Sequence, residues 1–131
     1  MITSIRMVLF VAVAFLLSAC GTMDKVGGLL QPSPAEQKLS SGIKSYEEGD
    51  YKPSMEALQG ALDMGLSSKD SQLVAYKYLA FIHCVSGREK QCRDSFKKAF
   101  EIDTNFDLKP AEAGHPVWGP VFRSVKAKPA K

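Results

Sequence analysis

The feature that most constrains the fold is a pair of short helices around a glycine turn, because this pattern occurs twice. The clearer copy spans 41–62 and turns at Gly49, and a fainter copy spans 79–100 and turns at Gly87. A helical hairpin that recurs along a chain buries its apolar side on the neighbouring copy. The sequence therefore predicts an all-α fold. Small residues keep step with both turns: Gly42 and Ala80 stand seven positions before the glycine, and Ala61 and Ala99 twelve after it.

Helix-boundary signals frame the first hairpin. Ser33 is a candidate N-cap, with Pro34 at the first helical position and Glu36 at the third, which is the arrangement of a capping box. Gly65 predicts a left-handed cap where the second helix ends. Apolar residues at helical spacing supply the inner faces of both helices: Leu39, Ile43, Tyr46, Tyr51, Met55, Leu58, Ala61 and Leu62.

The second hairpin is more apolar than the first. Ser68 or Asp70 can cap its first helix, in which apolar residues surround much of the circumference. Such a helix is packed by neighbours on both flanks, so we expect it at the centre of the domain. The following helix has one apolar face, made of Cys92, Phe96, Ala99 and Phe100.

Residues 107–126 are expected to complete the stack, because two repeats are fewer than the three usually needed. Pro110–Ala113 can form one helical turn, and a last helix after His115 carries Trp118 and Phe122 on one face. We expect this helix to cap the second hairpin. In the alternative, Trp118 and Phe122 stay exposed as anchors for a partner, since aromatic side chains are enriched in binding hot spots.

The N-terminus predicts export from the cytoplasm. Residues 1–6 form a short basic start, and residues 7–17 form an apolar run of eleven, whereas a bilayer span needs roughly 20 residues. This pattern is typical of a secretory signal. The run can be a plain signal peptide cut after Ala19, a buried apolar helix, or the signal of a lipid-anchored protein.

The end of the apolar run, Leu17-Ser18-Ala19-Cys20, resembles the lipobox of bacterial lipoproteins. The resemblance implies that residues 1–19 are a cleaved lipoprotein signal peptide. It also implies that Cys20 carries diacylglycerol and an acyl chain such as palmitate. Because Gly21 follows the cysteine where an Asp would favour the inner membrane, the rule for this class implies the periplasmic face of the outer membrane.

Two segments beside the domain are predicted to lack regular structure. Residues 20–34 contain Gly27-Gly28 and Pro32-Ser33-Pro34, which break helices and strands, so we expect a flexible tether after the lipidated cysteine. In the alternative, the apolar residues of this stretch lie on the domain: Val26, Leu29 and Leu30. Residues 127–131 are expected to form a frayed tail.

Composition and motifs argue against several classes of function. Lys and Arg outnumber Asp and Glu by 17 to 14, and the excess of +3 is scattered, unlike the clustered stripe of a nucleic-acid-binding protein. No Ser or Cys has a recognisable histidine partner, and no glycine-rich phosphate loop is present. His83 and two cysteines are too few for a metal site. We therefore expect neither an enzyme nor a protein that binds nucleic acid, a small-molecule substrate, a metal or a cofactor.

Two cysteines remain after lipidation, Cys84 and Cys92, and they flank the Gly87 turn. Their places on two antiparallel helices bring them close to facing each other. Because the periplasm is oxidising, the pair is a disulfide candidate. Two buried free thiols are the alternative.

The two hairpins together resemble the tetratricopeptide repeat, a unit of 34 residues. The units run over about 35–68 and 73–106, with four extra residues between them near 69–72. The first unit departs from the pattern at Lys38, Ser41 and Ser45, where bulkier apolar groups are usual. The matching positions of the second unit are Tyr76, Leu79, Ala80, Gly87, Phe96 and Ala99, and those of the first are Gly42, Gly49, Tyr51, Ser54 and Ala61.

This resemblance implies a protein-interaction domain, because the first helix of each repeat lines a concave groove in that family. A groove that is apolar with one charge of each sign suits a short peptide or helix. In the alternative, the chain's own tail or Leu29-Leu30 covers the groove. The implied groove residues are Leu39, Ile43, Tyr46 and Glu47 from the first unit, and Val74, Lys77, Phe81, Cys84 and Val85 from the second.

The lipobox, the two repeats and the closing segment 114–122 (GHPVWGPVF) also resemble TssQ-like lipoproteins associated with type VI secretion. The resemblance implies an accessory or assembly factor of an envelope complex, with a protein or peptide of that complex as its partner. The alternatives are assembly of a pilus or secretin, insertion of outer-membrane proteins, and cell-wall maintenance.

Overall fold

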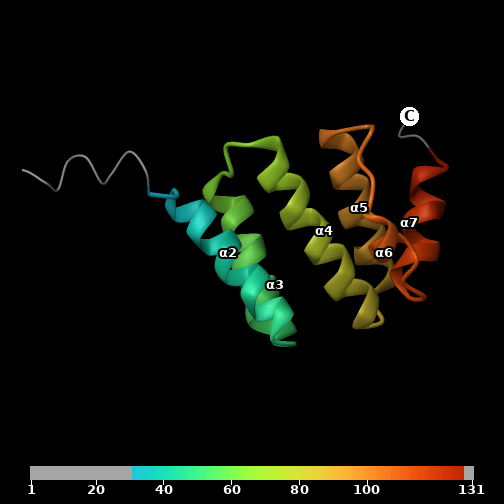
Figure 1. Ribbon diagram of the computed structural model, residues 1–131, viewed down its shortest axis with the longest axis horizontal. Coiled ribbons are helices and arrows are strands. Elements are labelled where there is room, and N and C mark those ends of the chain that lie inside the picture. The colour runs from blue at the N-terminus through green and yellow to red at the C-terminus, as the bar shows by residue number, and fades with distance from the viewer. Residues whose placement is uncertain (1–30, 129–131) are drawn as a thin grey trace, which may run out of the picture. The chain divides into compact units, whose positions relative to one another are not determined.

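The computed structural model describes residues 31–128, which form six helices and no strand (Figure 1). The predicted signal peptide, Cys20 and most of the tether lie outside the described residues. The all-α prediction is confirmed. The helices are α2 (Pro34–Glu47), α3 (Tyr51–Met64), α4 (Lys69–Val85), α5 (Glu89–Ile102), α6 (Pro110–Ala113) and α7 (Trp118–Lys126).

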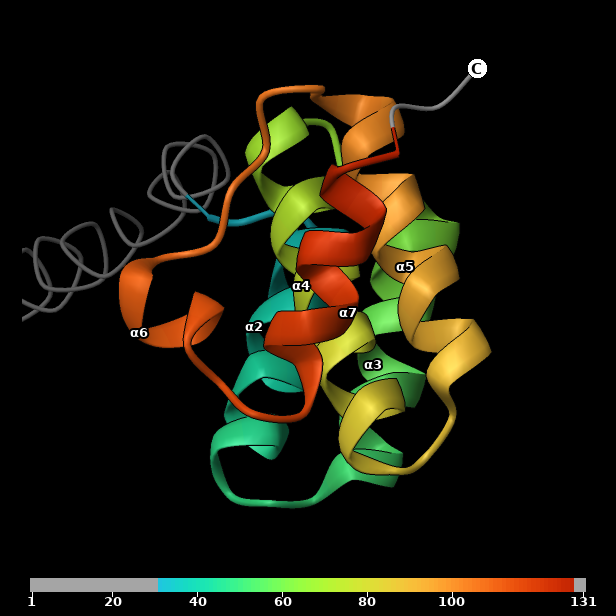
Figure 2. The ribbon, with the colours of Figure 1, turned by 90° about the vertical axis from the view of Figure 1, so that its right-hand side faces the viewer.

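The helices form two hairpins and a closing helix. α2 pairs with α3 and α4 pairs with α5, while α7 packs on both α4 and α5 at the end of the stack. α4 also contacts α2 and α3, so it takes the central position expected from its apolar circumference. In Figure 2, α6 lies on one side of α7 and α5 lies on the other.

The turns and caps form largely where the sequence predicts them. Gly49, Gly65 and Gly87 all have positive φ, at 82°, 89° and 72°, a backbone region that glycine enters without a Cβ penalty. Ser33 Oγ accepts a hydrogen bond from the Glu36 N–H at 3.2 Å, and Ser68 Oγ accepts from the Ser71 N–H at 3.0 Å. These side chains satisfy amides that a helix start leaves without partners.

One part of the predicted capping box differs in the structure. The Glu36 carboxylate accepts a hydrogen bond from Ser71 Oγ at 3.0 Å, 35 residues away, instead of the backbone N–H of Ser33. The first turn of α2 is thereby joined to the first turn of α4. The hydrogen bond of Glu36 to Ser71, which joins the two hairpins, has replaced the local bond to the Ser33 N–H. The spacing of residues in the sequence does not reveal this exchange.

Small residues let α2 and α3 approach closely. Ser54 is fully buried, and its hydroxyl donates to the Gly42 carbonyl at 2.7 Å. A Cβ on Gly42 would lie 2.8 Å from Leu58 Cγ and 3.1 Å from the Leu58 backbone nitrogen. The glycine and the serine, which the repeat pattern singled out, therefore sit where the two helices cross.

The core has two clusters that meet on α4. One gathers side chains of α2, α3 and the inner side of α4, including Leu39, Leu58 and Ile82. The other gathers aromatic side chains of α4, α5, α7 and the segment before α6. Its largest members are Phe81, Phe96, Phe106, Trp118 and Phe122.

The last helix begins slightly later than the sequence suggested. α7 starts at Trp118, and His115 Nδ1 accepts a hydrogen bond from the Val117 N–H at 3.2 Å just before it. Pro120 lies in the first turn, where the missing N–H of proline costs no helical hydrogen bond. The predicted capping role of this helix is confirmed, since it packs on α4 and α5.

The α2–α3 crossing gives a matched pair of glycine variants. Gly42→Ala should lower the free energy of unfolding by about 1–2 kcal/mol, because the overpacking outweighs the gain in helix propensity. Gly60→Ala, also within a helix, should be neutral or stabilising by up to about 1 kcal/mol, because its Cβ meets only the flexible end of Lys38. Urea denaturation of both variants measures the difference, and equal losses would contradict this account of the crossing.

Candidate functional site

Four of the eight predicted partner-binding residues lie in the core. Leu39, Phe81, Trp118 and Phe122 expose only 5%, 2%, 8% and 2% of their surfaces. The structure therefore places these four side chains in the core, and α7 covers the part of the predicted groove that lies on α4. The physical reason is the short stack: residues 31–128 hold two helical hairpins, and the C-terminal segment itself buries the apolar face of the second one.

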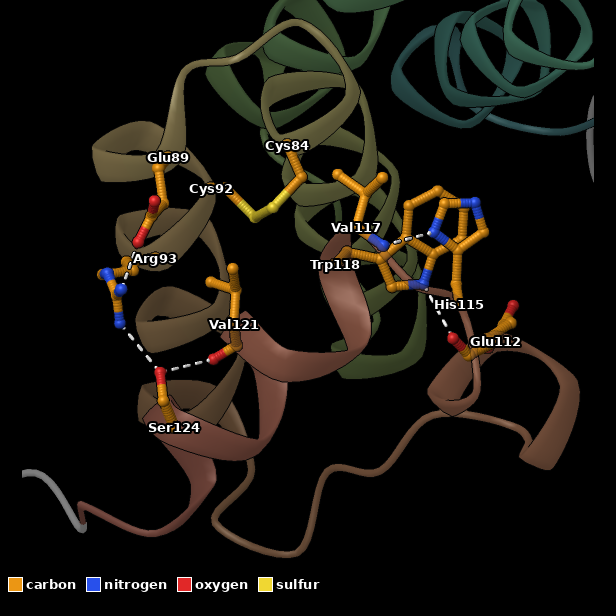
Figure 3. Close-up of a disulfide and its surroundings, with 10 residues drawn as sticks. All are labelled: Cys84, Glu89, Cys92, Arg93, Glu112, His115, Val117, Trp118, Val121 and Ser124. Carbon is orange, nitrogen blue, oxygen red and sulfur yellow. Dashed lines mark hydrogen bonds and ion pairs between the residues drawn. A yellow bond between two sulfur atoms is a disulfide. The ribbon is translucent and has the colours of Figure 1, made fainter.

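Trp118 is the main group that covers α4. Its ring stacks on Phe81 with centroids 4.2 Å apart, and His115 stacks against the indole from outside. The indole N–H donates to the Glu112 carbonyl at 2.8 Å, so the polar end of this buried side chain is satisfied (Figure 3). The α6–α7 connection is thus held over the face that was expected to bind a ligand.

Lys77 also helps to hold the α6–α7 segment against α4. Its ammonium lies 2.7 Å from Glu112 Oε1, and the two side chains are only 13% and 21% exposed. A partly buried pair of this kind is costly to break, because either charge would be left poorly solvated. The ammonium of Lys77 is therefore engaged by Glu112 of α6 in this structure.

The part of the predicted surface that stays accessible lies at the end of α2. We call it the tyrosine surface. Tyr46 packs between Tyr51 and Tyr78, with ring centroids 5.8 Å and 4.9 Å away, so three helices contribute a tyrosine. Tyr46 and Tyr78 are half-buried, and Tyr51 is exposed. The surface comprises Ile43, Tyr46 and Glu47 of α2, Tyr51 of α3, and Val74 and Tyr78 of α4.

The phenols of Tyr46 and Tyr78 are protonated at neutral pH. Burial raises the pKa of Tyr46 to about 12, with smaller contributions from Tyr51, Tyr78 and Glu112. Burial, Glu47 and Glu112 also raise the pKa of Tyr78. The two hydroxyls can therefore donate hydrogen bonds to a bound molecule, while their rings offer apolar area.

Sequence reasoning missed two residues of importance here. Tyr78 stands four positions after Val74, on the same face of α4, so helical spacing could have added it to the predicted groove. Glu112 lies 35 residues from Lys77, and no feature of the sequence predicted the ion pair between them.

Cys84 and Cys92 form a disulfide across the Gly87 turn, as predicted (Figure 3). Their Cα atoms are 5.1 Å apart, and both residues are buried. The bond joins the end of α4 to the start of α5. Arg93, one residue after Cys92, donates to Ser124 Oγ at 2.8 Å and so connects α5 to α7.

Groups suited to catalysis are sparse within residues 31–128. No cluster of three His, Cys, Asp or Glu side chains could hold a metal ion among the described residues. His83 and His115 lie in separate segments. Burial and the nearby Arg88 lower the pKa of His83, and its Nδ1 is buried with no hydrogen-bond partner in the described part of the chain.

A comparison of the chain with protein-family models, curated proteins and solved structures finds no match. Among the described helices, none combines the length and the apolar character needed to cross a bilayer. The geometry above is therefore the basis of the functional argument.

The disulfide gives a direct prediction. Replacing both partners, Cys84→Ser with Cys92→Ser, should cost about 2–3 kcal/mol of stability, because the native bond closes a short loop in the unfolded chain. The native protein should show no alkylatable thiol at these two positions until a reductant is added. Mass spectrometry after alkylation measures this, and two free thiols in the native protein would contradict the bond.

Proposed function

We propose that this chain is an exported lipoprotein whose helical domain binds a protein or peptide partner through the tyrosine surface. The observation that carries the proposal is the cluster of Tyr46, Tyr51 and Tyr78, which three helices hold at an accessible surface. Tyrosine is enriched among residues that dominate binding energy, since it offers large apolar area with a polar tip.

The scaffold supports a binding role. Two stacked hairpins with a closing helix position side chains from separate helices on one rigid surface, in the way that tetratricopeptide-like proteins present their ligand sites. We propose that the chain is a short member of that class, in which the C-terminal segment occupies part of the usual groove. The partner therefore meets a smaller surface, with Glu47 as its exposed charge.

The proposed location is the periplasmic face of the outer membrane, with a diacylglycerol and acyl anchor on Cys20. The Cys84–Cys92 disulfide supports an oxidising compartment, because cytosolic thiols are kept reduced. The proposed partner belongs to an envelope complex, and the sequence resemblance favours type VI secretion. Assembly of a pilus or secretin and insertion of outer-membrane proteins are the second candidates.

The lipid anchor can be tested by metabolic labelling with a palmitate analogue. The wild-type chain should take up label and sediment with membranes, because several acyl chains anchor a protein far more strongly than one. Cys20→Ser should lose both the label and the membrane association. Unlabelled wild-type protein would contradict the anchor.

Binding by the tyrosine surface can be tested by photo-crosslinking in cells, with a photoreactive residue at position 47. Tyr46→Ala or Tyr78→Ala should lower the yield of the crosslinked partner by about tenfold or more, as expected for hot-spot residues. Tyr76→Ala is the matched control, because Tyr76 is also half-buried and, at about 100° per residue, points about 200° away from Tyr78 around α4.

The outcome also distinguishes the candidate systems. Identification of the crosslinked protein as a type VI secretion component would support the more specific proposal, and a pilus, secretin or outer-membrane insertion component would favour the second candidates. An equal loss of crosslinking in Tyr76→Ala would mean that the tyrosine surface is not the binding site.

A further inference from the structure

A second candidate site lies where α5 and α7 end. The two helices pack against each other, and in Figure 2 both finish at the same end of the domain. A pocket of about 360 Å³ opens between their last turns. We call it the terminal pocket. It is lined by α5, the turn after α5, and the end of α7 with the residues that follow: Lys97, Phe100, Glu101, Thr104, Val125, Lys126 and Lys128.

The floor of the terminal pocket is apolar. Phe100 is half-buried, and its ring stacks on Phe122 with centroids 5.6 Å apart and meets Phe106 at 5.7 Å. Val125 lies beside it in the lining. Because the aromatic cluster holds one side of the Phe100 ring, the ring is fixed in place while part of it stays accessible. An apolar side chain that enters the pocket therefore meets a preformed contact and gains by leaving water.

The rim of the terminal pocket is basic. Lys97, Lys126 and Lys128 are exposed, and Glu101 is the only carboxylate among the described residues that line the pocket. Glu101 is 2.8 Å from Lys98, so its charge is met within α5. The aliphatic stems of lysines can extend the apolar floor while their ammonium groups reach water.

The carboxylates near the rim neutralise only part of this charge. Lys126 is 2.6 Å from Asp107 and is therefore paired. Asp94 is shared between two lysines, at 2.9 Å from Lys90 and 3.7 Å from Lys97. Lys97 thus has the weaker share of one carboxylate, and its exposed ammonium is available to a further anion.

Lys128 is less compensated still, since it forms no salt bridge with any residue of 31–128. Asp103, in the turn after α5, accepts a hydrogen bond from the Asn105 N–H at 2.8 Å, and adding its charge still leaves the surface positive. The lining and its ion-pair partners hold five lysines against three carboxylates: Lys90, Lys97, Lys98, Lys126 and Lys128 against Asp94, Glu101 and Asp107.

The size of the pocket and its charges favour one type of occupant. A volume of about 360 Å³ is near the lower end of the range for small-molecule sites, roughly 300–1,000 Å³, and suits a large side chain that anchors a partner. Lys97 stands one turn before Phe100 on α5, and Lys128 follows α7, so two elements bring positive charge to the apolar floor. A chain with carboxylates on both sides of an apolar anchor meets this arrangement.

We propose that the terminal pocket binds an acidic segment of a protein partner, which inserts one large apolar side chain against Phe100 and Val125. Carboxylates on either side of that anchor pair with Lys97 and Lys128. The terminal pocket shares no residue with the tyrosine surface. Binding there is therefore independent of the proposed function, and the chain can hold two partners at once.

Three labelled peptides of equal length test the proposal on the full chain purified in an uncharged detergent. The first has a central phenylalanine between aspartates, the second has alanine at the centre, and the third has lysines in place of the aspartates. Fluorescence anisotropy should show that the first peptide binds at least about tenfold more tightly than either other, and that salt weakens it. A photoreactive residue at Thr104 should capture the first peptide, and one at Glu47 should not.

Neutralising the two less compensated lysines provides the decisive comparison. Lys97→Gln with Lys128→Gln should weaken the first peptide by about tenfold or more. Lys38→Gln with Lys69→Gln removes the same charge at exposed positions of α2 and α4, outside both the terminal pocket and the tyrosine surface. That control should leave the affinity within about twofold. Unchanged thermal midpoints confirm that both double variants are folded.

Several results would overturn the proposal: no saturable binding of the first peptide, equal binding of all three peptides, equal effects of the two double variants, or capture at Glu47 instead of Thr104. Two others would assign the pocket to a different occupant and overturn it as well. These are tighter binding of short-chain phosphatidylglycerol than of the first peptide, and self-association of the chain that Lys97→Gln with Lys128→Gln abolishes.

The proposed function is judged separately, by Tyr46→Ala, Tyr78→Ala and the crosslinks formed in cells. Failure of the peptide experiment leaves those crosslinks unchanged. Loss of the tyrosine surface as a binding site, in turn, leaves the affinity of the terminal pocket for the first peptide unchanged.

Discussion

The packing of Trp118 on Phe81 is the contact on which the rest of the domain depends. α4 is apolar around much of its circumference, and the hairpins cover it with side chains of α2, α3 and α5 but leave one face of Phe81 for the closing segment. The indole covers that face, with its N–H bonded to the Glu112 carbonyl. Because a two-hairpin stack is too short to be self-sufficient, this closing contact is a structural requirement.

Two polar contacts and one covalent bond support this arrangement. The Lys77–Glu112 ion pair holds α6 to α4, Arg93 holds α7 to α5, and the disulfide fixes α5 against α4. The Trp118 contact joins α7 to α4, and the disulfide and Arg93 connect α5 to those two helices. The aromatic cluster therefore supplies most of the contact between α7 and the second hairpin. The polar contacts and the disulfide restrict how these helices can move relative to one another.

The packing of the C-terminal segment also determines which surfaces of the domain remain accessible. The closing segment covers Phe81 on α4 and leaves the tyrosine surface accessible at the end of α2. On the other side of α4 the helices α3 and α5 stay apart, so Tyr76 and His83 remain accessible between them. α4 thus has two partly exposed faces, one with Tyr78 beside Tyr46 and one with Tyr76 and His83.

Local signals determined much of this protein. The glycines at 49, 65 and 87 ended or turned helices because they tolerate positive φ, and Ser33 and Ser68 began helices by capping free amides. The disulfide followed from the spacing of two cysteines around one turn. Phe81 and Trp118 could have been partner-contacting residues or core residues. Their mutual contact, between positions 37 residues apart in the sequence, places both in the core. Only the tertiary structure decided that, because an apolar stripe looks the same whether a partner or the chain itself covers it.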